Sequence, residues 1–146
     1  MILGNAGTGI VNADTGTLEM GDSTIIRNRQ GIDNSGTFTI CGYSEIYHNA
    51  GANVGGIDNS GTFTVDSYSE IRYNAGANVG GIDNSGLLTL NYIEITRNQA
   101  ANSDGTGVLW QHGANAELTL SNYEDIDFLS AHDRSALRGH RHGGDR

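Results

Sequence analysis

The chain alternates apolar and polar residues over short runs, and Gly, Asn and Ser separate these runs. In the segment Thr37-Phe38-Thr39-Ile40 every second residue is apolar, which is typical of a β-strand with one buried face. This alternation differs from the three- and four-residue spacing of apolar positions in an amphipathic helix. The pattern therefore predicts an all-β chain built from short strands.

A repeat organises the strands. The string Gly-Ile-Asp-Asn-Ser-Gly begins at Gly31, Gly56 and Gly81, with a period of 25 residues. Looser copies begin at Gly9 and Gly107. A period of about 20 to 50 residues is typical of repeat arrays in which each unit packs on its neighbours. Because one copy holds three short strands, we predict that the copies stack into a parallel β-helix.

Four apolar columns appear when the five copies are aligned, and they predict the core. The first column holds Ile10, Ile32, Ile57, Ile82 and Val108. The second holds Leu18, Phe38, Phe63, Leu88 and Leu118. The third holds Met20, Ile40, Val65, Leu90 and Leu120, and the fourth holds Ile25, Ile46, Ile71, Ile95 and Ile126. Stacking would place each side chain about 4.8 Å from its equivalent in the next coil.

Two columns of Asn predict the corners between strands. The first column holds Asn12, Asn34, Asn59 and Asn84, and the second holds Asn28, Asn49, Asn74 and Asn98. Stacked Asn amides can hydrogen-bond along the axis, and Asn tolerates the left-handed backbone that a tight corner needs.

The predicted organisation is a β-helix domain over residues 1–130 and a C-terminal cap helix with a basic tail over 131–146. Ser130 begins a Ser-Ala-His-Asp sequence that resembles a capping box and predicts a short helix after it. Trp110 and Leu129 align with the column Asn of earlier copies, where larger apolar side chains would seal the last coil.

The repeat also resembles a known family. Gly-Gly-Ile-Asp-Asn-Ser-Gly-Thr-Phe-Thr-Val at 55–65 and Ser-Glu-Ile-Arg-Tyr-Asn-Ala at 69–75 are similar to the extracellular repeats of polymorphic outer-membrane-protein and autotransporter-type adhesins. The resemblance spans roughly residues 9–126. It implies a right-handed parallel β-helix, here of about five coils, and an extracellular or cell-surface location. The Met-Ile-Leu-Gly start lacks a basic region followed by an apolar one, so we expect no signal peptide in this chain.

The composition argues against several classes of partner and structural feature. The formal net charge is −9, and an acidic surface repels the phosphate backbone, so we expect no nucleic-acid partner. No apolar run approaches the roughly 18 residues of a membrane-spanning helix, so we expect no membrane span. Cys41 is the only cysteine, which excludes an internal disulfide.

Two acidic columns are candidates for chemistry. Asp33, Asp58 and Asp83 follow the first core column and face outward, where their mutual repulsion could be relieved by bound Ca²⁺. The alternative is a solvated ladder with raised carboxylate pKa values and no cofactor. The second column holds Glu45, Glu70, Glu94 and Asp125. Paired carboxylates could serve a glycoside hydrolase, but repetition at equivalent sites favours a structural role, because a catalytic pair needs unequal environments.

Aromatic and hydroxyl columns are candidates for binding. The Tyr column holds Tyr43, Tyr68, Tyr92 and Tyr123. It either stabilises a corner or offers a platform for a sugar or a partner protein. The Thr pairs are Thr37 with Thr39 and Thr62 with Thr64. Their spacings of about 7 Å along a strand and 4.8 Å between coils resemble the arrays of ice-binding β-solenoids, although Glu19, Leu87 and Glu117 interrupt the array.

Three function classes follow. We expect a non-catalytic scaffold for surface display or for binding a protein or glycan; the alternatives are an ice-binding solenoid and a pectin-lyase-like carbohydrate enzyme. We also expect self-association through the first coil. Gly4, Ala6 and other small residues before Thr8 would leave Ile10 and Leu18 poorly covered, and an open β-edge is a template for another chain.

Overall fold

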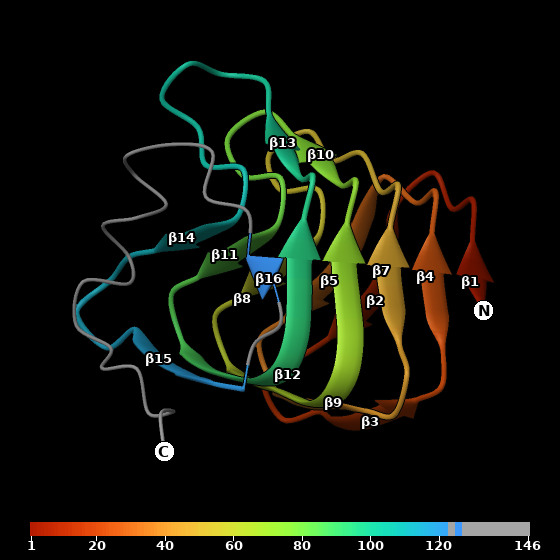
Figure 1. Cartoon of the computed structure of the whole chain (residues 1–146), viewed down its shortest axis with the longest axis vertical. Coiled ribbons are helices and arrows are strands. Elements are labelled where there is room, and N and C mark those ends of the chain that lie inside the picture. Colours follow the sequence, from red (N-terminus) through yellow and green to blue (C-terminus); the bar gives the residue numbers. More distant parts are fainter. Residues whose placement is uncertain (123–124, 127–146) are drawn as a thin grey trace.

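The computed structural model describes residues 1–122 and 125–126, and these form a parallel β-solenoid of about four turns. Every strand pair within it is parallel, and the strands stack along one axis with the N-terminus at one end (Figure 1). The all-β prediction is confirmed, with no helix among the described residues. The coil count is about four, lower than the five expected. The cap helix and tail predicted after residue 130 lie outside the described residues.

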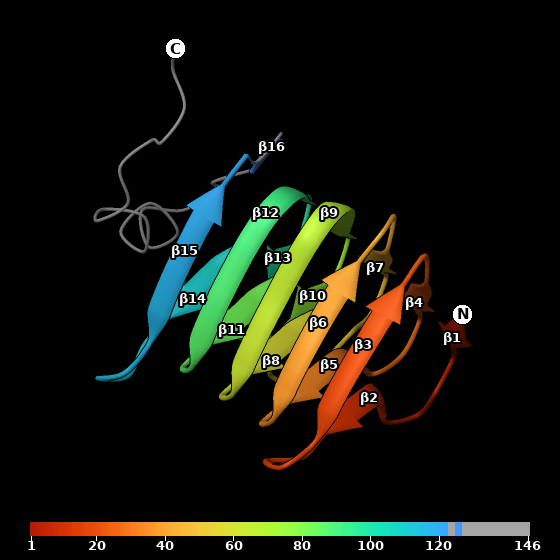
Figure 2. The same cartoon turned by 90° about the horizontal axis from the view of Figure 1, so that it is seen from below.

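Three faces enclose the core (Figure 2). The first face contains β2 (Thr8–Asn12), β5 (Gln30–Asn34), β8 (Ile57–Asn59), β11 (Ile82–Asn84) and β14 (Leu109–Gln111). The second contains β3 (Thr17–Gly21), β6 (Thr37–Cys41), β15 (Glu117–Ser121) and the first halves of β9 (Thr62–Arg72) and β12 (Leu87–Thr96). The third contains β1 (Ile2–Leu3), β4 (Thr24–Ile26), β7 (Glu45–Tyr47), β16 (Asp125–Ile126) and the second halves of β9 and β12.

A small fourth pair, β10 (Ala75–Gly76) with β13 (Gln99–Ala100), lies on the connection from the third face back to the first. We call the three turns of each coil the first corner, between the first and second faces, the second corner, and the third corner, which carries this pair. In the described part of the chain, no helix has the length and apolar character to cross a membrane.

The core confirms the second, third and fourth apolar columns residue by residue. Phe38 pairs with Phe63 and Ile40 with Val65 in the backbone register, and the two Phe rings stack with centroids 5.1 Å apart. In-register stacking of identical or similar side chains is the reason why a short coil without a core of its own becomes stable in the array.

The first column needs one correction. Leu109, not Val108, pairs with Ile82, so Trp110 aligns with Asp83 and Gln111 aligns with Asn84. Aligning the fifth copy on Gly107 was therefore wrong by one position. Val108 and Leu109 are both buried. Trp110 consequently lies on the outward column of the first face, and the prediction that it replaces a corner Asn to seal the core was wrong.

Both Asn columns form the hydrogen-bonded ladders that the sequence predicts. In the first, the Nδ2 of Asn34 donates to the Oδ1 of Asn59 over 2.8 Å, and Asn59 donates to Asn84 over 2.7 Å. In the second, Asn49 donates to Asn74 over 2.9 Å and Asn74 to Asn98 over 3.0 Å.

The left-handed positions lie elsewhere than predicted. At the third corner they belong to the residue before each ladder Asn, namely Arg27, His48, Tyr73 and Arg97, with φ between 53° and 55°. The ladder amides instead bond to one another and to backbone carbonyls, as Asn74 does to the carbonyl of Ile46. Asn serves here as a buried hydrogen-bonding group and not as a residue tolerant of positive φ.

The N-terminal end is more covered than the sequence suggests. β1 pairs with β4, so Ile2 lies over Ile25 and packs against the core. Asn5 donates to the Oδ1 of Asn28 over 2.8 Å and so extends the second ladder by one member. Coverage is confined to the third face and the third corner, because β2 and β3 are terminal strands of their sheets.

Candidate functional site

Three tyrosines stack at the second corner, as the sequence predicts. The ring centroids of Tyr43 and Tyr68 lie 5.6 Å apart, and those of Tyr68 and Tyr92 lie 5.0 Å apart. The three residues are 72%, 48% and 38% exposed, respectively. Tyr123, the fourth member of the predicted column, lies outside the described residues. We call Tyr43, Tyr68 and Tyr92 the tyrosine ladder.

The backbone fixes the ladder in place. Tyr68 and Tyr92 adopt positive φ values of 26° and 51°, which is uncommon for residues other than Gly and Asn. Before Tyr43 the corresponding conformation belongs to Gly42, with φ of 68°. Although β12 turns this corner with one residue fewer than β9, one Tyr per coil still projects from it.

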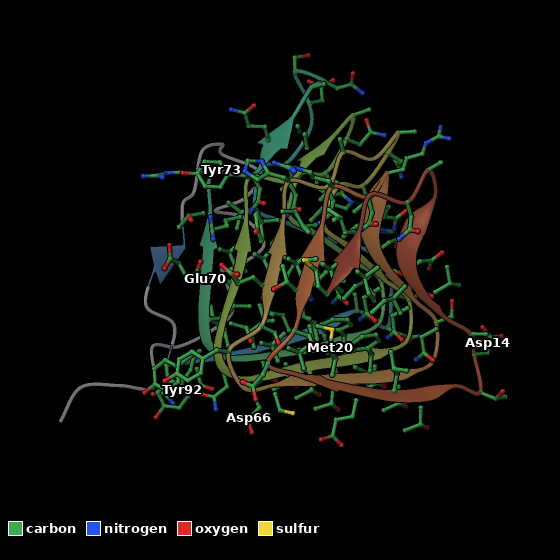
Figure 3. The ribbon with its side chains drawn as sticks, turned by 90° about the vertical axis from the view of Figure 1, so that its right-hand side faces the viewer. Asp14, Met20, Asp66, Glu70, Tyr73 and Tyr92 are labelled. Atoms are coloured by element: carbon green, nitrogen blue, oxygen red, sulfur yellow. The ribbon has the colours of Figure 1, made fainter. Side chains whose placement is uncertain are left out.

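A shallow groove of about 150 Å³ runs beside the tyrosine ladder. Its lining consists of the three Tyr rings with Ser69, Glu70, Ile93 and Glu94. Figure 3 shows Tyr92 at one corner of the coil and Tyr73 at another, with Glu70 on the face between them. Aromatic edges, phenol hydroxyls and carboxylates therefore lie side by side along the axis.

Two members of the second acidic column, Glu45 and Glu70, form an ion-pair network with Arg72. Arg72 lies between two coils, with its Nη2 at 2.5 Å from the Oε1 of Glu45 and its Nε at 2.6 Å from the Oε2 of Glu70. The same guanidinium lies 4.7 Å from the centroid of the Tyr47 ring. Two carboxylates that share one guanidinium have similar surroundings, which is the arrangement expected of structural groups.

The sequence reasoning missed a further outward column, at the third corner. The ring of His48 stacks on that of Tyr73 with centroids 5.2 Å apart, and Arg97 lies over the other side of the Tyr73 ring at 5.3 Å. The signal was present in the sequence, because each of these residues directly precedes a ladder Asn.

The Asp column is in register, as predicted. Asp33 pairs with Asp58 and Asp58 with Asp83. Partial burial and the charges of Asp83 and Asp33 raise the pKa of Asp58 to about 6, and His112 opposes the shift. The Nε2 of His112 lies 2.7 Å from the Oδ1 of Asp83.

Nothing in this geometry favours a calcium site. Within the described residues, no three His, Cys, Asp or Glu side chains come together in a way that could hold a metal ion. A Ca²⁺ site at Asp33, Asp58 and Asp83 stays a prediction.

The Thr array is more extensive than the two pairs named from the sequence. Thr37 pairs with Thr62 and Thr39 with Thr64, as predicted. The strand register places three further threonines in the same two columns, namely Thr17, Thr89 and Thr119. One column thus holds three Thr and the other four, and both lie on the second face. Leu87, Glu117 and Glu19 interrupt them.

Comparison with models of known protein families finds no match, and neither do comparisons with curated proteins and with solved structures. The likeness to outer-membrane-protein and autotransporter-type repeats therefore rests on the repeat sequence alone. Function has to be argued from the geometry of the surfaces described above.

Proposed function

We propose that this chain is a non-catalytic binding scaffold and that the tyrosine ladder is its contact surface for a linear polysaccharide. The observation that carries the proposal is the ladder itself, with rings 5.6 Å and 5.0 Å apart along the solenoid axis. Because the rings stack on one another, they present edges and hydroxyls to solvent. A contact surface that repeats from coil to coil suits a ligand that also repeats.

The groove chemistry supports a carbohydrate. Sugars combine apolar C–H faces with hydroxyls, and binding sites for such ligands combine aromatic side chains with a few placed polar groups. Glu70 and Glu94 beside the rings are hydrogen-bond acceptors for hydroxyls. Their charge disfavours polyanionic chains such as polyuronates, so neutral polysaccharides are the expected ligands.

The proposal is tested by co-sedimentation with insoluble cellulose, chitin and xylan. The variant is Tyr68→Asn with Tyr92→Asn, because Asn accepts positive φ and should leave the corner folded. The matched control is Leu87→Thr, which removes a side chain that is 45% exposed on another face. We expect the double variant to bind at least tenfold more weakly than the parent to the polysaccharide that sediments the parent. The control should bind as the parent does. The proposal fails if the chain stays in the supernatant with every polymer, or if the double variant binds as the parent does.

A second candidate function is ice binding, and the register of the second face is the observation that favours it. Two Thr columns on a parallel sheet repeat at about 7 Å along the strand and 4.8 Å across it. The test is thermal hysteresis at millimolar protein. Leu87→Thr would extend one Thr column from three to four members and should raise the activity. Thr64→Tyr would place a large ring in the middle of the array and should abolish it. Freezing behaviour equal to that of an albumin solution would end this candidate.

A further inference from the structure

A cavity of about 520 Å³ opens at the third corner, away from the tyrosine ladder and the Thr array. Its lining comes from three successive coils: Asn53, Asn78, Val79, Asp83, Asn102, Ser103, Asp104, Thr106 and Trp110. The volume lies within the range of about 300 to 1,000 Å³ that is usual for small-molecule sites.

The wall of this cavity contains a buried hydroxyl without a partner. Thr106 is fully buried, and its Oγ1 makes no hydrogen bond in the structure. The backbone around it is held on both sides, because the N–H of Thr106 donates to the carbonyl of Asn78 over 2.7 Å and its carbonyl accepts from Gly80 over 2.9 Å. Buried hydroxyls are normally paired. The Oγ1 of Thr106 has almost no accessible surface, so a ligand group would reach it only after a small shift of this side chain.

The polar rim offers acceptors. Asn102 donates to the Oδ1 of Asn78 over 2.6 Å, and Asn78 donates to Asn53. This short row of Asn53, Asn78 and Asn102 ends at Asn102, whose side-chain carbonyl receives no hydrogen bond from another described residue. The carboxylates of Asp83 and Asp104 add acceptors on the adjoining walls.

The charge of the cavity is negative. Its lining includes Asp83 and Asp104 and no Lys, Arg or His among the described residues. The Asp column continues from Asp83 through Asp58 to Asp33 along the first face. His112, which contacts Asp83 from outside this lining, adds a positive charge only when it is protonated. The half-buried ring of Trp110 lines the same cavity, and an indole face attracts cations.

We propose that this cavity binds a small organic molecule that carries a primary ammonium group. The ammonium has three N–H donors and no acceptor, which matches a lining rich in carboxylate, amide and hydroxyl oxygens. Its charge complements Asp83 and Asp104, and its alkyl portion lies against Trp110. This inference uses none of the residues of the tyrosine ladder and does not depend on polysaccharide binding.

The test is isothermal titration calorimetry of the full chain with 1,4-diaminobutane at pH 7.5 and low salt, with glucose and tetramethylammonium as comparison ligands. We expect the diamine to bind, and to bind less tightly in 0.5 M NaCl because salt screens the attraction. Tetramethylammonium, which has no N–H donor, should bind at least tenfold more weakly. Glucose should give no heat.

Variants distinguish specific binding in the cavity from non-specific attraction of a cation to an acidic protein. Asp104→Asn removes one charge from an exposed loop position and should weaken diamine binding about fivefold, the effect of one charge at short range in water. Thr106→Val keeps the shape of the side chain and should weaken binding while leaving the melting temperature unchanged or raised. Asp14→Asn, an exposed position between β2 and β3, is the matched control and should bind as the parent does.

Three results would overturn the proposal. One is the absence of heat with millimolar diamine. Another is equal weakening by Asp14→Asn and Asp104→Asn, which would show attraction to net charge only. The third is salt-independent binding of glucose as tight as that of the diamine, which would identify a neutral-sugar site.

Discussion

Replacing Asn59 by Asp tests how much of the stability resides in the first Asn ladder. Asn59 is fully buried. Its Nδ2 donates over 2.7 Å to the Oδ1 of Asn84 and over 3.0 Å to the carbonyl of Leu87. Asp has the same shape but, when ionised, donates nothing. The buried Oδ1 of Asn84 and the partly buried carbonyl of Leu87 then lose their donor and face a carboxylate instead. Each buried group left unpaired costs about 1 to 3 kcal/mol, so we expect a loss of about 4 kcal/mol at pH 7.

The pH dependence of Asn59→Asp has a definite sign. Burial and the two facing oxygens raise the folded-state pKa of the new carboxyl above its unfolded value. The unfolded chain therefore loses its proton first as pH rises, and the variant becomes progressively less stable than the parent. Lowering the pH protonates the group, restores one donor and recovers part of the loss.

Urea denaturation followed by circular dichroism at pH 7.5 and pH 4 measures both effects. The matched control is Asn53→Asp, which makes the same change in an exposed ladder, where Asn53 accepts from Asn78. We expect the control to lose less than about 1 kcal/mol. The reasoning is refuted if the two variants unfold at the same urea concentration at pH 7.5, or if the deficit of Asn59→Asp is unchanged at pH 4.

Three further predictions concern other parts of the solenoid. Asp58 has its pKa raised to about 6, so folding stability should fall as pH rises from about 4 to 6; Asp58→Asn should be about 1 kcal/mol more stable than the parent at pH 7.5, after allowance for solvent screening, and equal to it below pH 4 in urea titrations. Gly56→Ala would place a Cβ 2.3 Å from the carbonyl oxygen of Gly81, and should lower the free energy of unfolding by at least about 2 kcal/mol in the same assay. The free edge of β3 leaves Leu18 half-buried, so light scattering over a concentration series should show self-association that Leu18→Lys reduces; a monomeric mass for the parent at every concentration would contradict this.

The core could be predicted from the sequence because its signal is repeated. Phe38 and Phe63 occupy equivalent positions in copies that share a 25-residue period, so one alignment fixes both their burial and their partners. The same holds for Asn34 and Asn59 in the first ladder. Each position is specified several times over, and an error in one copy is corrected by the others.

Prediction failed where a copy departs from its neighbours. The loop before β14 differs in length from the loops before β8 and β11. The sequence alignment was therefore shifted by one residue and placed Val108 in the core column that Leu109 occupies. The backbone conformation of the corners also escaped the sequence reasoning. Positive φ falls on Tyr73 and Arg97, residues whose intrinsic preferences give no sign of it. The ladder Asn residues that follow them supply the buried hydrogen bonds that hold this conformation.

The same departure from repetition explains where an individual ligand site can arise. In the inner coils the third corner follows the repeat. The outward position on the adjoining first face is then Asp33, Asp58 or Asp83. At the next coil the position becomes Trp110, and a longer loop carries Asp104 and Thr106 over the corner. Equivalent groups in equivalent surroundings can bind a repeating ligand or support the fold, but they cannot give one side chain a distinct environment. The cavity with its orphaned hydroxyl forms at a coil where the repeat is broken, because neighbouring coils there present different side chains to the same space.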